Sequence, residues 1–90
     1  MATSYRFVVT GRVQGVGFRN GAQGKALFLG LRGWVRNRSD GAVEGLAGGA
    51  ARELQLFRDW LAKGPPAAAV ERLEWSVSAD ETQEGFLILR

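Results

Sequence analysis

The sequence contains no cysteine and no histidine, and these two absences exclude many kinds of active site. Without cysteine, the chain has no disulfide scaffold, no thiolate metal ligand and no cysteine nucleophile. Without histidine, it lacks the usual general base, the usual metal-binding imidazole and every serine–histidine or cysteine–histidine pair. Any chemistry here must therefore proceed without a side chain that shuttles protons near neutral pH.

Long apolar runs and long runs of one charge are also missing. No apolar run approaches the roughly 20 residues that span a bilayer, and residues 1–6 lack the apolar core of a secretory signal peptide. We therefore expect a cytoplasmic protein. The net charge of +3 comes from scattered Lys and Arg residues. It is compatible with an ordinary soluble surface and with a weak preference for anionic partners.

The 90 residues, 46% of them hydrophobic, predict a single domain over residues 1–90 with one modest core. Period-two and period-3.6 patterns of apolar residues, together with turn signals, predict the order β-α-β-β-α-β and a short last strand. Two right-handed crossovers then place both helices on one face of an antiparallel sheet, which is the ferredoxin-like α+β sandwich. The predicted strands are 5–12, 31–37, 42–46, 70–78 and 86–89, and the predicted helices are 19–29 and 50–63.

The most informative segment is residues 11–19, which read Gly-Arg-Val-Gln-Gly-Val-Gly-Phe-Arg between a predicted strand and a predicted helix. Glycines allow backbone N–H groups to turn inward around an anion, and a helix N-terminus adds partial positive charge. The planar guanidinium of Arg19 can bind two oxygens of one phosphoryl group. The segment predicts a phosphoryl-binding loop, although the glycines alone are also compatible with a tight connection, and Arg19 with an ordinary surface arginine.

These residues resemble the acylphosphatase family. The resemblance covers residues 5–89, because the blocks Gly-Leu-Arg-Gly-Trp-Val-Arg-Asn at 30–37 and Asp-Gly-Ala-Val-Glu-Gly at 40–45 also match, as do segments 64–67 and 86–88. It departs from the family at Ala22, where a threonine is common, and at Gly21 and Gly24, which favour a helix less than usual. Carried over by position, the phosphate-binding arginine is Arg19, the catalytic asparagine is Asn37, and the phosphate cradle is formed by Gln14, Gly15, Val16, Gly17 and Phe18.

The resemblance implies hydrolysis of small acyl phosphates to a carboxylate and inorganic phosphate, with no metal, no cofactor and no covalent intermediate. The expected partners are the small-molecule acyl phosphate and inorganic phosphate, as product or competing ligand. We expect a monomer that binds neither nucleic acid nor membrane.

The missing histidine is compatible with this reaction. An acyl phosphate leaves as a carboxylate, whose conjugate acid has a pKa near ~4, so its departure at pH 7 needs no proton. Asn37 can accept a hydrogen bond from the attacking water and donate one to the phosphoryl group, which makes it an orienting group. On its own, however, Asn37 is more typical of a hairpin end than of a catalytic group. For Gln14, bracing of the loop and direct contact with the ligand both remain open.

Other functions share parts of this pattern. The carbamoyl-phosphate-handling module of larger hydrogenase-maturation carbamoyltransferases has similar motifs, but the initial Met and a last strand near residue 90 favour a complete small enzyme. RRM domains, which bind nucleic acid, share the element order and place aromatic residues on their middle strands. The predicted third strand has none, and it carries the acid Glu44. A catalytically silent anion-binding domain is a further alternative.

Several neighbouring side chains have two interpretations. Trp34 is expected to pack rather than to line the acyl side of the substrate, and Trp60 and Trp75 are expected at the core or its margin. Arg36 and Arg38 flank Asn37, either as solvated charges or as groups that attract an anionic substrate.

Overall fold

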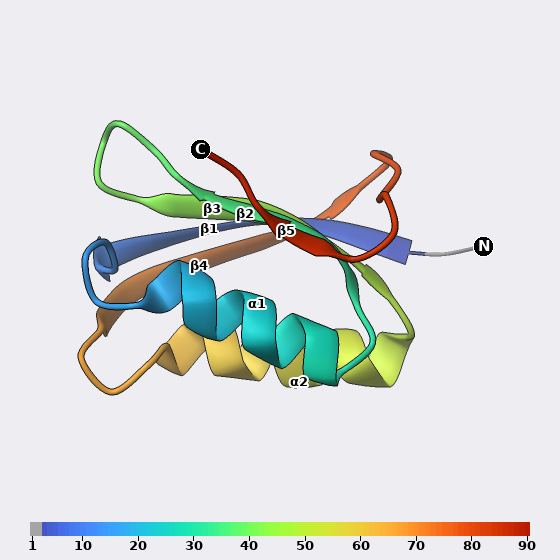
Figure 1. The fold of residues 1–90 in the computed structure, drawn as a ribbon, viewed down its shortest axis with the longest axis horizontal. Coiled ribbons are helices and arrows are strands. Elements are labelled where there is room, and N and C mark those ends of the chain that lie inside the picture. The colour runs from blue at the N-terminus through green and yellow to red at the C-terminus, as the bar shows by residue number, and fades with distance from the viewer. Residues whose placement is uncertain (1–2) are drawn as a thin grey trace.

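Two helices cover one face of a five-stranded sheet in the computed structural model, which describes residues 3–90 (Figure 1). The element order agrees with the sequence prediction. The elements are β1 (Thr3–Arg12), α1 (Phe18–Phe28), β2 (Arg32–Asn37), β3 (Val43–Gly49), α2 (Ala51–Lys63), β4 (Ala69–Ser78) and β5 (Phe86–Ile88).

The sheet has the strand order β4-β1-β3-β2-β5. The pairs formed by β1, β2, β3 and β4 are antiparallel, as expected for the α+β sandwich, whereas β5 pairs with β2 in parallel. The difference arises because residues 79–85 carry the chain from the β4 edge to the opposite edge of the sheet, so that β5 runs in the direction of β2. The sheet is therefore mixed, with a parallel pair at one edge.

The core lies between the sheet and the helices and is rich in aromatic rings. The ring of Phe57 on α2 meets the rings of Phe7 and Phe86 edge to face, at centroid distances of 5.8 and 5.7 Å. The residues Leu54, Phe57 and Leu61 are buried, which confirms the apolar stripe predicted for this helix. Burying such side chains contributes about 1.5–3 kcal/mol each.

Helix α1 forms despite its glycines, and helix packing explains why position 21 is a glycine. A Cβ at Gly21 would lie 2.9 Å from the ring of Trp60 on α2, so the missing side chain allows the two helices to approach. The same indole packs edge to face on Phe18, with centroids 5.5 Å apart. Ala22, the position where the family often has threonine, is fully buried.

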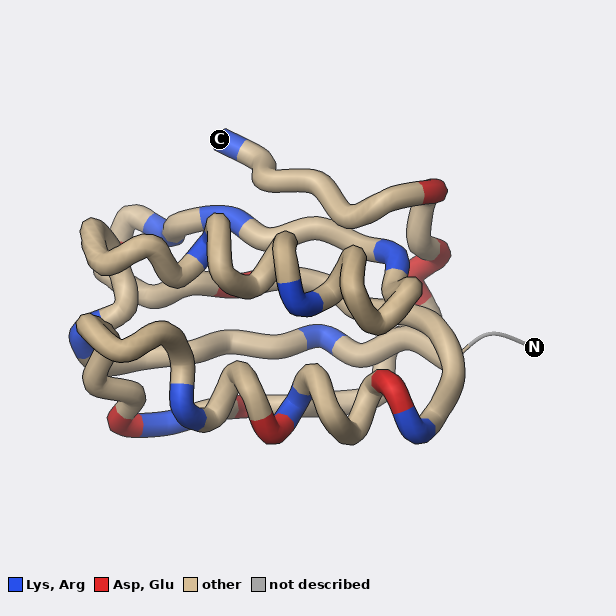
Figure 2. Tube along the Cα trace, turned by 60° about the horizontal axis from the view of Figure 1, so that its bottom comes forward, with Lys and Arg blue, Asp and Glu red and all other residues tan. Residues whose placement is uncertain are grey.

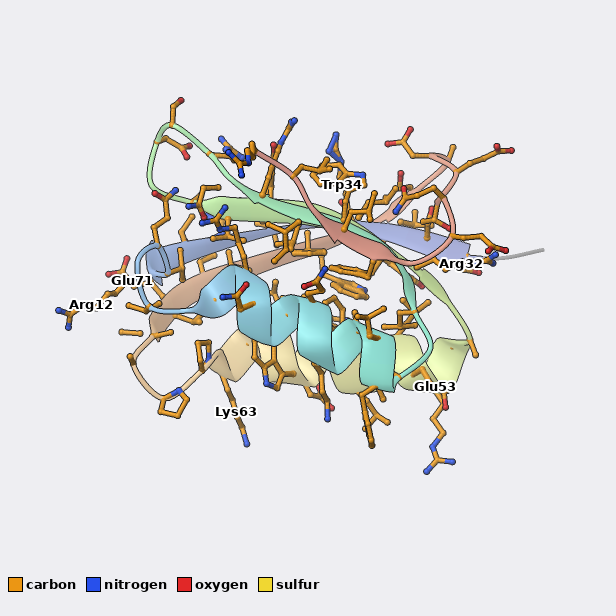
Figure 3. All side chains as sticks on the ribbon, in the orientation of Figure 1. Arg12, Arg32, Trp34, Glu53, Lys63 and Glu71 are labelled. Carbon is orange, nitrogen blue, oxygen red and sulfur yellow. The ribbon has the colours of Figure 1, made fainter. Side chains whose placement is uncertain are left out.

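The opposite face of the sheet carries Trp34 (Figure 3). Two guanidinium groups lie over its ring, with that of Arg6 5.4 Å and that of Arg36 5.0 Å from the ring centroid. This packing agrees with the structural role expected for Trp34. Among residues 3–90, no helix is long and apolar enough to cross a membrane.

Candidate active site

The topology brings the glycine-rich loop and Asn37 to the same end of the sheet. Both β1 and β2 run antiparallel to β3, which lies between them. The C-terminal ends of β1 and β2 therefore lie at the same end of the sheet. The loop of residues 13–17 follows β1, and Asn37 is the last residue of β2. The loop and Asn37, which are far apart in the sequence, are therefore neighbours at this end of the sheet.

The loop takes a backbone shape that requires glycine. Gly15 and Gly17 have φ angles of 73° and 80°, in the left-handed region that other residues adopt only with strain. A Cβ at either position would meet no atom within 4 Å, so the requirement comes from the backbone conformation and not from crowding. Gly17 is the N-cap of α1, and no side chain caps the helix start or adds acidic charge to the first turn. Free N–H groups and the helix dipole favour an anion at this point.

A small pocket of about 150 Å³ lies where the loop, the start of α1 and the end of β2 meet. It brings together five of the predicted site residues, whereas Gln14 and Val16 do not line it. Sequence reasoning missed two lining residues, Val13 and Asn20. The only signal for them was their position beside the predicted loop and beside Arg19. The lining residues are Val13, Gly15, Gly17, Phe18, Arg19, Asn20 and Asn37.

The two predicted catalytic side chains reach the pocket with unused hydrogen-bonding capacity. Arg19 is half-buried and has no ion pair or side-chain hydrogen bond within residues 3–90. The Oδ1 atom of Asn37 is buried and has no partner among the same residues. An unpaired buried acceptor costs about 1–3 kcal/mol, and such groups concentrate at functional sites.

Gln14 has a bracing role. Its side-chain Nε2 donates hydrogen bonds to the carbonyl oxygens of Arg38, at 2.7 Å, and Ala42, at 2.9 Å. Both amide hydrogens are thereby engaged, so the structure supports the bracing interpretation of this side chain over direct contact with a ligand. The two bonds tie the loop to the hairpin between β2 and β3.

That hairpin is held by charged side chains. The Nε of Arg36 donates to Glu44 at 2.6 Å, and Arg38 pairs with Asp40 at 2.7 Å. The pKa of Asp40 lies below its usual value of 3.8, mainly because its carboxylate accepts the N–H of Ala42, and also because Arg38 is close. The turn that follows Asn37 is therefore ordered by several polar contacts.

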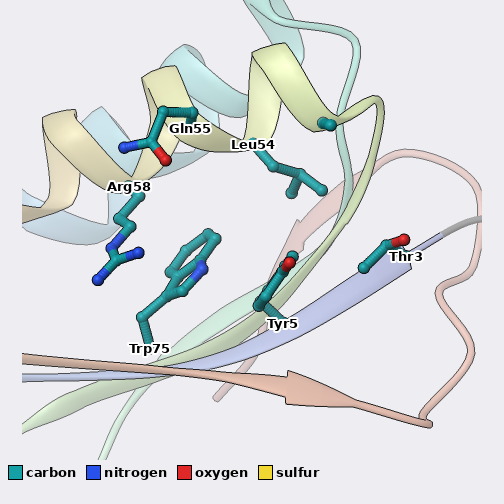
Figure 4. Close-up of a pocket in the computed structure, with 7 residues that line it drawn as sticks. Thr3, Tyr5, Leu54, Gln55, Arg58 and Trp75 are labelled. Carbon is teal, nitrogen blue, oxygen red and sulfur yellow. The ribbon is translucent and has the colours of Figure 1, made fainter.

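Neither the distribution of basic residues nor the pocket beside α2 points to a competing site. Figure 2 shows Lys and Arg distributed over several elements and not gathered on one. A separate pocket of about 310 Å³ between α2 and the sheet contains Tyr5, Trp75 and Arg58 (Figure 4). There Tyr5 stacks on Trp75 at 4.9 Å, and the guanidinium of Arg58 lies 5.9 Å from the same indole. These side chains already contact one another, and none belongs to the predicted site.

The fold and the pocket together define an α+β sandwich with a glycine-rich, anion-binding loop. The model of the acylphosphatase family matches residues 5–88. A curated acylphosphatase from Cupriavidus pinatubonensis is 49% identical over 79% of this chain and 79% of its own length. The chain therefore belongs to the acylphosphatase family, and the expectation that it is an acylphosphatase enzyme is confirmed.

Solved structures support the same conclusion. The crystal structure of acylphosphatase from Bacillus subtilis has a TM-score of 0.93 and 42% identity, with full coverage of both chains. A structure of HypF from T. kodakarensis has a TM-score of 0.81 and 33% identity, covering 96% of this chain but 11% of that one. The same fold therefore also occurs as a small part of a much longer chain.

Proposed function

We propose that the chain hydrolyses the carboxyl–phosphate anhydride of small acyl phosphates, with the phosphoryl group bound in the pocket at the start of α1. The observation that carries the proposal is the meeting, in one pocket, of a glycine-shaped loop with a guanidinium and an amide oxygen that have no partner among residues 3–90. Family membership supplies the reaction class. The assignment of roles to residues is our inference from chemistry and position.

Arg19 and the loop amides of residues 14–18 would bind the phosphoryl oxygens. The loose transition state of phosphoryl transfer keeps its charge on three equatorial oxygens, so positioning and charge compensation supply most of the catalysis. Since Arg19 has no other ion-pair partner within residues 3–90, its donors are available for this purpose. A lysine could supply the charge but not the planar fork.

Asn37 would orient the attacking water. Its unpaired Oδ1 can accept a hydrogen bond from the water, while its Nδ2 can donate to the phosphoryl group. The water oxygen forms a bond to phosphorus as the bond from phosphorus to the acyl oxygen breaks. The carboxylate leaves with the electron pair, and both water protons end on the released phosphate. An amide is not a base, so the contribution of Asn37 is orientation.

The test is hydrolysis of benzoyl phosphate in EDTA by the parent protein and by Arg19→Ala, Arg19→Lys and Asn37→Ala. Removing one preorganised group at such a site lowers kcat by about 10²–10³, and we expect at least this loss in all three variants. Arg52→Ala, an exposed change on α2, is the control and is expected to retain full activity. Circular dichroism checks the fold of each variant. Inactivity of the folded parent would reject the proposed hydrolysis of small acyl phosphates, and full activity of Asn37→Ala would reject the water-orienting role.

Carbamoyl phosphate is a second candidate substrate, because the sequence motifs are also similar to those of the carbamoyl-phosphate-handling module considered above. The same assay with carbamoyl phosphate discriminates between the two substrates by their kcat/KM values. A single domain over residues 1–90, a cytoplasmic location and a monomeric state remain our predictions. Sedimentation and limited proteolysis check the oligomeric state and the domain boundaries.

A further inference from the structure

Besides Arg19 and Asn37, the phosphate pocket is lined by one further polar side chain, that of Asn20. The other four lining residues are glycine or apolar. Asn20 is exposed, so it lies at the mouth of the pocket. Its amide makes no hydrogen bond to another residue within residues 3–90. The amide is therefore available to a ligand bound in the pocket.

The place of Asn20 in α1 directs its side chain toward the start of the helix. Asn20 is the third residue of α1, and the Cα–Cβ bonds of an α-helix tilt toward its N-terminus. The N–H of Gly21 donates the first helical hydrogen bond, to the carbonyl oxygen of Gly17 at 3.0 Å. The N–H groups of residues 18–20 therefore have no partner inside the helix. The amide of Asn20 lies beside these backbone donors, where the helix start favours an anion.

The start of α1 lacks the acid that is present at the start of α2. Both helices have an arginine as their second residue, Arg19 in α1 and Arg52 in α2. The third residue of α2 is Glu53, whose negative charge stabilises the positive end of the helix. The third residue of α1 is the neutral Asn20, and the first turn of α1 contains no acid. A carboxylate at this position would repel a bound anion, whereas an amide can donate a hydrogen bond to it.

We infer that Asn20 is a further phosphoryl-binding residue, whose Nδ2 donates a hydrogen bond to a phosphoryl oxygen at the mouth of the pocket. The inference rests on the proposed function, because it requires the phosphoryl group to lie at the start of α1. A hydrogen bond to an ionised acceptor is roughly twice as strong as one between neutral groups. Asn20 holds the phosphoryl group from the exposed side of the pocket, while the buried Oδ1 of Asn37 lies at the inner side.

The experiment measures the Kd of inorganic phosphate by calorimetry in the parent protein, Asn20→Ala and Asn20→Asp. Removal of the donor in Asn20→Ala should raise this Kd about 3- to 10-fold, the range for one hydrogen bond that is partly exposed to solvent. The Kd should rise further in Asn20→Asp, because the carboxylate has no donor and repels the phosphate. The same change should raise the Tm of the phosphate-free protein, because it adds an acid to the first turn of α1. A purely structural role would not give these opposite effects on stability and binding.

Gln55→Ala and Gln55→Glu are the matched controls, because they remove an amide or add a negative charge at an exposed position in the separate pocket beside α2. Neither should change the Kd of phosphate. In a parent that hydrolyses benzoyl phosphate, an unchanged Kd in Asn20→Ala would overturn the role of Asn20 and leave the proposed function intact. An equal effect of Gln55→Glu and Asn20→Asp on the Kd would also overturn it. A folded parent that neither binds phosphate nor hydrolyses benzoyl phosphate would reject the proposed function itself, and the role of Asn20 with it.

Discussion

Replacement of Gln14 by methionine tests whether the loop is positioned from outside the phosphate pocket. The change keeps the length of the side chain and removes both donors, so the bonds of 2.7 and 2.9 Å to the hairpin carbonyls are lost. Each such bond contributes about 0.5–1.5 kcal/mol net. The two together predict a loss of about 1–3 kcal/mol in the free energy of unfolding.

The two carbonyl groups that lose their hydrogen bond from Gln14 add nothing to this loss of unfolding free energy. The oxygen of Ala42 also accepts the N–H of Arg38 at 2.8 Å, and the oxygen of Arg38 accepts the N–H of Gly41 at 3.3 Å. Neither acceptor becomes unsatisfied, so the additional cost of a buried unpaired group does not apply. For a chain of this length, each kcal/mol corresponds to a fall in Tm of about 4–8 °C. Urea denaturation and thermal melting both measure the effect.

The functional effect of Gln14→Met follows from the same contacts. A loop released from the hairpin must be ordered again when an anion binds, and fixing even one residue costs about 1–2 kcal/mol. We expect inorganic phosphate, measured as a competitive inhibitor, to bind at least about fivefold more weakly, which corresponds to about 1 kcal/mol.

Gln23→Met is the matched control for this prediction. Gln23 on α1 donates one hydrogen bond, at 2.9 Å, to the carbonyl oxygen of Phe86, away from the loop. We expect its loss to lower stability by about 0.5–1.5 kcal/mol and to leave phosphate affinity unchanged. If Gln14→Met and Gln23→Met behave alike in both stability and phosphate affinity, the bracing argument is wrong.

Three further predictions concern stability. Gly24→Ala should raise the free energy of unfolding by about 0.5–1 kcal/mol in urea denaturation, because alanine favours the helix interior and the new Cβ meets no atom within 4 Å. Gly21→Ala should lower stability, because its Cβ would lie 2.9 Å from the Trp60 ring; the opposite order of the two variants would contradict the packing argument. For Asp40, a carbon NMR titration should give a pKa below 3.8 in the folded protein. Because the pKa is lowered by folding, the stability that this group contributes is complete above pH 3.8 and is lost as the pH falls through the folded pKa; an unshifted titration would refute the hairpin contacts.

The element order, the glycine-rich loop and the core stripe of α2 could be predicted from the sequence because each depends on local patterns. Apolar residues at period 2 or 3.6 indicate the buried face of a strand or a helix, and glycines indicate turns. The predicted boundaries agree with the structure to within a few residues; for example, α2 was predicted at 50–63 and is observed at Ala51–Lys63. The prediction of α1 is weaker because of its glycines, since the sequence alone does not show that Trp60 packs against Gly21.

What could not be predicted depends on contacts between distant segments. The parallel pairing of β5 with β2 follows from the path of residues 79–85 around the end of the sheet, and no local pattern specifies that path. The bracing by Gln14 joins residues 24 and 28 positions apart, and the sequence left this role open. Val13 and Asn20 enter the pocket only through the three-dimensional arrangement of the loop and α1.

The separation between the loop and Asn37 is set by strand register. Strand β3 pairs with β1 through Val9–Val43 and with β2 through Asn37–Val43, so one residue, Val43, fixes the relative positions of both site strands. A slip of one residue in the β2–β3 pairing would turn every side chain of β2 to the other face, moving Asn37 away from the pocket and Val35 out of the core. The hydrophobic effect that keeps Val35 and Val43 buried therefore also keeps Asn37 beside the loop. The geometry of the site is thus maintained by core packing, and side chains that never contact the substrate determine whether Arg19 and Asn37 can act together.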